Sequence, residues 1–522
     1  MPSRQEHKKN VHKTKSKIQE KTKKLNLYKP LAIALLVLVL TIYEYTYNGD
    51  TTWFWLGLIL SVIIMLPNIF WLATKKGTTF GLPLIFTMLK TKHFVNTIHK
   101  VSKHAKIMEK ISIVGMFSGF GIAGVDYWIA RKQGGLKRIL ILIISAIVLG
   151  IIFWYTMQML FAVPALAPLL IPGLIGFVLL GFGGLSLVFL LGYGVLSVLA
   201  VFAGEQICPS VAPVLPGVPI PGLGVVVPLI AWVSLGLILV IHEGAHGVML
   251  SYYKEKIHSV GLILVGIVPM GAFVEQDDKT FEKRDDKKQL LVLSAGPTSN
   301  LFTMLIGIIV FLLFLTAVAP LATNLNNEFS QMYSGIRVSS VEDTVSFCGI
   351  TKEAPAKGNL FPEDIIISLN GMDVNNVTFL SSEIAKSDEL NFRVLRNGVE
   401  ENVFIKPVLF ESMGIKRIGV VFEQIPTGYQ PPILTQILAS LISGISSIIF
   451  FFIILSFAVG MFNFLPSDPL DGGRMAKIIL LPYFGFLKFN KKETELFIGR
   501  LFVWLFLISI LVNLLPYVTM VI

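Results

Sequence analysis

Long apolar runs separated by short polar segments make up most of the chain. A helix rises 1.5 Å per residue, so about 20 apolar residues cross the roughly 30 Å hydrocarbon core of a membrane. Seven runs meet this requirement: 31–48, 53–73, 138–162, 226–250, 289–318, 435–464 and 499–520. Two more are ambiguous, because 164–203 has prolines and a glycine cluster near Gly181, and 111–130 is Gly-rich. The pattern predicts an α-helical polytopic membrane protein of about 8–9 spans.

One region has a different pattern and predicts a soluble insert. Between about 325 and 430, short segments rich in apolar residues alternate with turns that contain Gly, Asn and Pro. Four of these segments are predicted strands: Ile336–Val341, Ile365–Leu369, Phe392–Leu395 and Val403–Ile405. Such spacing is typical of a small β-rich domain.

Composition supports the membrane interpretation. Of the 522 residues, 54% are hydrophobic and 15% are charged, whereas a soluble globular chain has roughly a quarter charged residues. The apolar surface is therefore expected to lie against a lipid bilayer rather than in an aqueous core. This excludes an ordinary soluble globular protein.

The basic residues behind the net charge of +11 are concentrated in particular segments of the chain. The first 29 residues are rich in lysine, and they predict a solvated cytoplasmic tail under the positive-inside rule. The first apolar run comes too late for a cleavable signal peptide. No aromatic or motif pattern in this tail supports nucleic-acid binding, so none is expected.

A second basic segment spans 74–110, and its part from about 92 to 110 predicts a helix on an anionic membrane surface. Its apolar residues Ile98, Val101, Ala105 and Met108 recur at helical spacing among several lysines. The three histidines of this stretch do not fall on one helix face, so they are interpreted as surface residues.

Counting spans from a cytoplasmic N-terminus gives an orientation. The Pro-rich loop 204–225 and the insert are expected outside, and 251–288 inside. The predicted organisation is a basic tail (1–29), an N-terminal membrane region (30–203), the outer loop (204–225), a membrane core in two halves (226–320 and 435–522) and the insert (325–430). The chain is expected to be a multi-pass protein of the cell membrane.

The sequence His242-Glu243-Gly244-Ala245-His246 is the strongest chemical signal. Residues four apart share a helix face, so both imidazoles can bind one zinc ion, with Glu243 placed as a general base. Only two cysteines occur, which excludes a disulfide framework and a Cys-rich zinc site. The alternative is a polar helix–helix contact, but ionisable residues inside a membrane span are costly and usually functional.

A catalytic zinc needs one more protein ligand, usually a carboxylate or a histidine. Asp471 ends the helix-breaking run that begins at Asn463, and Gly472 and Gly473 follow it. Such irregular backbone at membrane depth lines a cavity or is buried in protein. Asp468 in the same run is the rival ligand, and a plain loop is the alternative interpretation.

The HExxH motif in one span and Asn463, Pro466, Asp471 and Gly472 in a later one resemble the site-2 protease family of intramembrane metalloproteases. The resemblance covers about 226–480 and includes the loop Pro269–Glu275, where Met270 departs from the pattern, and Asn300 at the start of the next span. It implies one zinc per chain, bound by His242, His246 and Asp471, with Glu243 as the base. Asn463, Pro466 and Asn300 would bind substrate.

The insert is also similar to the PDZ domains that many of these proteases carry. The similarity rests on Ala354–Ala356, Gly358–Leu360, Pro362–Asp364 and Asn370–Gly371, with Glu363 where glycine is usual. The alternative is a β-insert with a steric role alone.

The resemblance implies regulated intramembrane proteolysis, in which transmembrane segments of other membrane proteins are cut. Two alternatives stay open: a membrane zinc protease of another family, and a zinc transporter or metal-sensing receptor. The first would normally use a glutamate as third ligand, and the second does not need Glu243 beside the metal.

Overall fold

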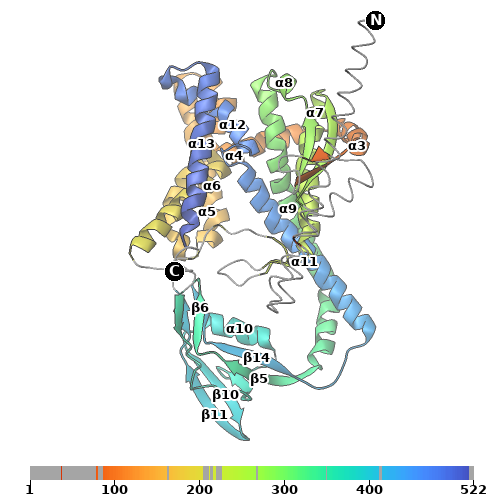
Figure 1. Cartoon of the computed structure of the whole chain (residues 1–522), viewed down its shortest axis with the longest axis vertical. Coiled ribbons are helices and arrows are strands. Elements are labelled where there is room, and N and C mark those ends of the chain that lie inside the picture. The colour runs from red at the N-terminus through yellow and green to blue at the C-terminus, as the bar shows by residue number, and fades with distance from the viewer. Residues whose placement is uncertain are drawn as a thin grey trace, which may run out of the picture. The chain divides into compact units, whose positions relative to one another are not determined.

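The computed structural model describes most of the chain after residue 85. The described residues are 37, 78–79, 86–161, 164–203, 208, 211, 215–218, 226–265, 268–348, 350–374, 376–410 and 414–516. The predicted tail 1–29 and almost all of the predicted spans 31–48 and 53–73 therefore lie outside the described residues. The chain divides into two units, Met1–Ile107 with Leu239–Arg284, and Met108–Ile238 with Asp285–Ile522. Figure 1 shows their elements.

Seven helices within the described ranges are long and apolar enough to cross a membrane. They are α4 (Lys106–Trp128), α5 (Gly135–Phe161), α6 (Leu170–Phe202), α7 (Ala231–Tyr252), α9 (Asp286–Ser330), α11 (Ile433–Asn463) and α13 (Lys491–Asn513). Five of the clear apolar runs are confirmed as helices. The two ambiguous runs are also helical. In the run 164–203, helix α6 follows a short 3₁₀ turn, η2 (Pro164–Leu169).

Helices α4 and α6 of the second unit are both interrupted at a glycine, and they approach each other there. Gly121 has φ 53° and Gly181 has φ 56°, which are left-handed values that favour glycine. A β-carbon at Gly181 would lie 2.0 Å from the Ser118 carbonyl oxygen, and one at Gly121 would lie 2.4 Å from the Val178 carbonyl oxygen. The predicted break at Gly181 is thus a close crossing of two backbones.

Helices α9 and α11 pack together and lead to the insert (Figure 1). A β-carbon at Gly307 would lie 3.0 Å from Ile453, and the rings of Phe311 and Phe450 are 6.5 Å apart. The 45 residues of α9 extend for about 68 Å, which is about twice the hydrocarbon thickness. The helix therefore continues well past the predicted end at residue 318.

Helix α13 begins at Lys491, eight residues before the predicted start. Asn490 caps it, since its side chain accepts from the Glu493 backbone N–H while Glu493 accepts from the Asn490 N–H. Near its other end, Asn513 donates to the Leu190 carbonyl of α6. Hydrophobicity located the apolar part of this helix but not its polar first turns.

The insert is a β-rich domain, as its pattern predicts. Its main sheet has the order β11-β10-β8-β5-β14, with β9 beside β8. The strands are β5 (Tyr333–Val341), β8 (Ile365–Leu369), β9 (Met372–Asp373), β10 (Leu390–Arg396), β11 (Val399–Ile405) and β14 (Val420–Pro426), and α10 (Val377–Lys386) adds Leu380 and Ile384 to the core. Two-residue Asn-Gly turns with positive φ join β8 to β9 and β10 to β11.

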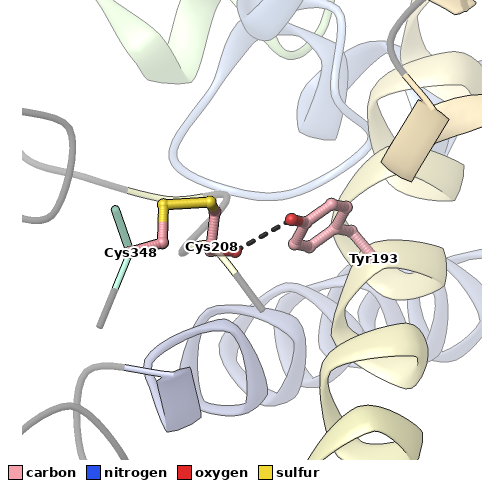
Figure 2. The surroundings of a disulfide bond; sticks show 3 residues. All are labelled: Tyr193, Cys208 and Cys348. Carbon is pink, nitrogen blue, oxygen red and sulfur yellow. Dashed lines mark hydrogen bonds between the residues drawn. A yellow bond between two sulfur atoms is a disulfide. The ribbon is translucent and has the colours of Figure 1, made fainter. Parts of the chain in front are cut away.

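Two short hairpins and a disulfide complete this domain. The hairpins are β6 (Thr344–Phe347) with β7 (Ile350–Glu353) and β12 (Val408–Phe410) with β13 (Ile415–Arg417). Cys348, which follows β6, is bonded to Cys208 from the segment between α6 and α7 (Figure 2). The Cys208 carbonyl accepts from the Tyr193 hydroxyl of α6 at 2.8 Å. Sequence reasoning excluded a disulfide framework and did not foresee this single bond, because its cysteines are 140 residues apart.

The first unit contains a four-stranded antiparallel sheet in the order β1-β2-β3-β4. The strands are β1 (Thr78–Thr79), β2 (Phe86–Thr91), β3 (Ile257–Val265) and β4 (Val268–Gln276), and helices α3 (His93–Ser102) and α8 (Asp278–Phe281) belong to the same unit. The segment Pro269–Glu275, expected to be a loop, is strand β4. Its pairing with β3 supplies backbone hydrogen bonds that local sequence did not reveal.

Candidate metal centre

Helix α7 positions the two histidines of the HExxH sequence. His242 and His246 are four residues apart, so they lie one above the other on a single helix face. Their Nε2 atoms are 3.2 Å apart, and the ring centroids are 4.9 Å apart. Both residues are buried, with exposures of 6% and 9%. Two imidazole nitrogens therefore converge on one point in a water-poor setting.

Glu243 follows His242 on the same helix turn and is partly buried. A long apolar stretch precedes the motif, and Ala245, Val248, Met249 and Leu250 around it are buried. A carboxylate beside two imidazoles in such surroundings can hold and transfer a proton. Its predicted role as a base is consistent with this placement and stays a prediction.

Asp471 is the first residue of helix α12 (Asp471–Ile479). The backbone before it folds back tightly over the two glycines that follow. A β-carbon at Gly472 would lie 2.2 Å from the Phe464 carbonyl oxygen, and one at Gly473 would lie 2.4 Å from the Asp468 nitrogen. Only glycine fits at both positions, so the tight fold of the backbone by itself requires Gly472 and Gly473 after Asp471.

Phe464 anchors this loop in the second unit. It is fully buried, and its ring fills the space that a β-carbon at Gly119 of α4 would occupy, at 2.2 Å. A β-carbon at Gly183 of α6 would lie 2.4 Å from the Phe464 carbonyl oxygen. The crossing of α4 and α6 therefore supports the loop that ends at Asp471. Sequence reasoning missed Phe464, since its role depends on contacts distant in the sequence.

Asp468, the rival ligand, has a different partner. Its carboxylate forms an ion pair with Lys477 of α12, nine residues later. A carboxylate held by an ammonium group is less available to a metal than one at the start of a helix. The side chain of Lys477 also lies against Gly499 of α13, which joins this pair to the last helix.

The ligand atoms of His242, His246 and Asp471 all lie within 4.8 Å of one another. A tetrahedral zinc with bonds of about 2.0 Å places its ligand atoms roughly 3.3 Å apart, and the two histidine nitrogens already have this separation. Two imidazoles and one carboxylate form a donor set that zinc accepts, leaving a fourth position for water or substrate. The residues present therefore fit a catalytic zinc ion.

The three predicted substrate-binding residues all lie in the second unit. Asn463 is the last residue of α11, and its amide donates to the Val459 carbonyl of the same helix at 3.0 Å. Pro466 is buried in the loop that follows, and Asn300 is fully buried on α9. Their roles in substrate binding stay predictions.

Comparison with known proteins gives one family and two relatives. Residues 230–507 match the family model described as Peptidase family M50. The chain is 26% identical over 254 residues to an uncharacterized protein of Methanocaldococcus jannaschii. The aligned residues make up 48% of this chain and 57% of that protein. It is 22% identical over 347 residues to a Rickettsia conorii protein named "Putative zinc metalloprotease". This alignment covers 54% of this chain and 96% of that protein. The family match contains both histidines and Asp471.

Proposed function

The chain belongs to peptidase family M50 and is a zinc metallopeptidase, and we propose that it hydrolyses peptide bonds within membrane-spanning segments of other proteins. One observation supports this above the others: the metal-binding histidines lie on α7, a helix apolar enough to cross a membrane. A substrate reaching this site would itself be a membrane segment.

The proposed chemistry assigns different tasks to the side chains of the site. His242, His246 and Asp471 would hold the zinc ion, which when bound supplies Lewis-acid activation of water and of the scissile carbonyl. Glu243 accepts the proton of the attacking water and passes it to the leaving amide nitrogen. The burial of both histidines keeps bulk water away, which strengthens every electrostatic interaction at the site.

A helical substrate has to unwind locally before water can reach its backbone, because helical hydrogen bonding occupies and shields each peptide group. An unwound strand then needs new partners for its N–H and C=O groups. We assign this task to Asn463, Asn300 and the irregular backbone near Pro466. In the present structure the Asn463 amide bonds to its own helix, and this bond would be exchanged for one to the substrate.

The disulfide supports the orientation that charge counting predicts. Disulfides persist in oxidising compartments and are rare in the cytosol. The bond joins Cys348 of the insert to Cys208, so the insert and the 204–225 loop would face outside. The N-terminus, the 251–288 segment and the active-site end of α7 would then face the cytoplasm, in a cell membrane.

The insert is proposed to be PDZ-like and to select substrates. Helices α9 and α11 connect it directly to the membrane core (Figure 1). A domain held there by two helices and a disulfide would obstruct membrane proteins that carry a bulky outer domain. Substrates already trimmed on the outside would enter, which is the logic of regulated intramembrane proteolysis.

A comparison of membrane proteins in cells tests this function. Cells with the wild-type protein are compared with cells carrying Glu243→Gln, with the chain at equal abundance. We expect one or more membrane proteins to accumulate uncut and to lose a cytoplasmic fragment in the variant. Identical fragment patterns in both cell types would argue against proteolysis and favour a zinc transporter or receptor.

A further inference from the structure

Helix α3 packs directly on the metal-binding turn of α7, and both segments belong to the first unit. Ile98 of α3 is buried, and a β-carbon at Gly247 would lie 3.0 Å from the Ile98 side chain. Gly247 is the residue immediately after His246. A shift of α3 would therefore displace Gly247, which is next to the zinc ligand His246, because close-packed interiors transmit displacement.

Hydrogen bonds join the same two helices one turn further along. His99 Nδ1 lies 2.7 Å from the Ser251 hydroxyl of α7, and this hydroxyl donates to Ser102 at 2.8 Å. Ser102 in turn donates to the His99 carbonyl at 2.9 Å. These contacts fix the rotation of α3 against α7, whereas the Ile98 contact fixes the distance between them.

The face of α3 that adjoins this contact is exposed. Phe94 and Val101, two turns apart and so on one face, are 64% and 51% exposed. Lys100 and Lys103 are exposed beside them. From residue 90 to residue 108 the sequence has five lysines and no Asp or Glu. An exposed apolar edge bordered by lysines alone is the composition of a helix that lies in an anionic bilayer surface.

We propose that α3 binds anionic lipid headgroups and that this binding stabilises the metal-binding turn of α7. Phe94 and Val101 would enter the acyl boundary while the lysines contact phosphates. The lysines favour an anionic partner, and the exposed apolar edge favours a lipid surface over a soluble acidic protein. Lipid composition would thereby tune how firmly His246 holds zinc.

The test uses the full-length protein with a fluorophore on α3. Both native cysteines are paired, so Phe94→Cys supplies the thiol for an environment-sensitive NBD label. The labelled protein is placed in vesicles of phosphatidylcholine, or of phosphatidylcholine with phosphatidylglycerol. Zinc loss to a chelator is measured in parallel on unlabelled protein.

Phosphatidylglycerol should shift the label's emission to the blue and slow zinc loss several-fold. Each lysine near an anionic surface contributes about fivefold to binding, so K100E with K103E should weaken the lipid response by at least about 25-fold. Lys386→Glu with Lys406→Glu on the insert makes the same charge change and should leave the response intact. Ile98→Ala should retain the emission shift and lose most of the lipid effect on zinc.

Three results would overturn the proposal. They are equal emission in both vesicles, a blue shift that survives charge reversal on α3, and a shift produced equally by soluble polyglutamate. None of these readouts involves peptide cleavage, so failure here is separate from failure of the proposed function.

Discussion

At the scale of residues, Asp468 and Asp471 lie three positions apart and have different surroundings. Asp468 pairs with Lys477, whereas Asp471 begins α12 and reaches the two histidines. The HExxH histidines could be predicted from sequence, because helical spacing alone brings them together. The residues alone left Asp468 open as a rival, and the family resemblance favoured Asp471. The shape of the loop, set by Phe464 against Gly119 and Gly183, could not be predicted from the sequence.

The first prediction separates the two aspartates. Asp471→Ala should remove most of the bound zinc, because only two protein ligands would remain. Asp468→Asn should keep about one zinc per chain while losing the ion pair to Lys477. Metal analysis of both purified variants provides the measurement. Zinc loss from Asp468→Asn with full retention in Asp471→Ala would exchange their roles.

The second prediction concerns Glu363 in the insert. Its φ of 72° is left-handed, a conformation that costs a non-glycine residue about 1–2 kcal/mol. Its carboxylate also pairs with Arg337 at the exposed surface, which contributes little. Glu363→Gly should therefore keep or raise the melting temperature, and Glu363→Val should lower it. Thermal unfolding in detergent measures both, and a more stable Val variant would contradict this reading of the backbone.

At the scale of elements, apolar run length predicted helices well and predicted their ends poorly. Helix α13 starts early because a capping box satisfies its first turn, and α9 continues past its predicted apolar run toward β5. Strand β4 was expected to be a loop because its segment contains Pro269 and Gly271, whereas its pairing with β3 makes it a strand. In each case polar or backbone interactions, rather than hydrophobicity, determined the boundary.

The third prediction tests the crossing of α4 and α6. Gly181→Ala would place a methyl group 2.0 Å from a carbonyl oxygen at a left-handed position, so we expect a loss of at least about 2 kcal/mol of stability. Gly236→Ala on α7 is the matched control, since among the described residues no atom beyond its chain neighbours and the adjacent backbone of its own helix lies within 4 Å of its β-carbon. The control should be neutral or stabilising by up to about 1 kcal/mol.

Thermal unfolding of the two variants in one detergent gives the comparison. Equal melting temperatures would mean that the backbones do not cross as closely as described. Because Phe464 rests on the same crossing, Gly181→Ala should also reduce zinc content, and Gly236→Ala should not.

At the scale of the whole molecule, the proposed sidedness rests on two independent properties. Lysine distribution predicts that the 251–288 segment lies inside, and the Cys208–Cys348 bond favours an oxidising space for the insert. Sequence alone supplied the first property. The second required the fold, because nothing local indicates which cysteines meet.

The fourth prediction measures this sidedness in intact cells. A cysteine introduced at Glu353 should react with a membrane-impermeant thiol reagent added outside. A cysteine at Lys283 should react only after the membrane is opened. The reverse pattern would overturn the orientation and the direction in which a cleaved fragment is released.

The central claim is that Glu243 transfers protons while the histidines and Asp471 hold the metal. Glu243→Gln keeps the size and hydrogen bonding of the side chain and removes the base. Purified wild-type and variant proteins are compared in liposomes for cleavage of a helical membrane substrate, with zinc content measured on the same preparations. We expect equal zinc and a fall in cleavage of about 10²–10⁴-fold. Near-normal cleavage by a zinc-loaded Glu243→Gln protein would contradict the account.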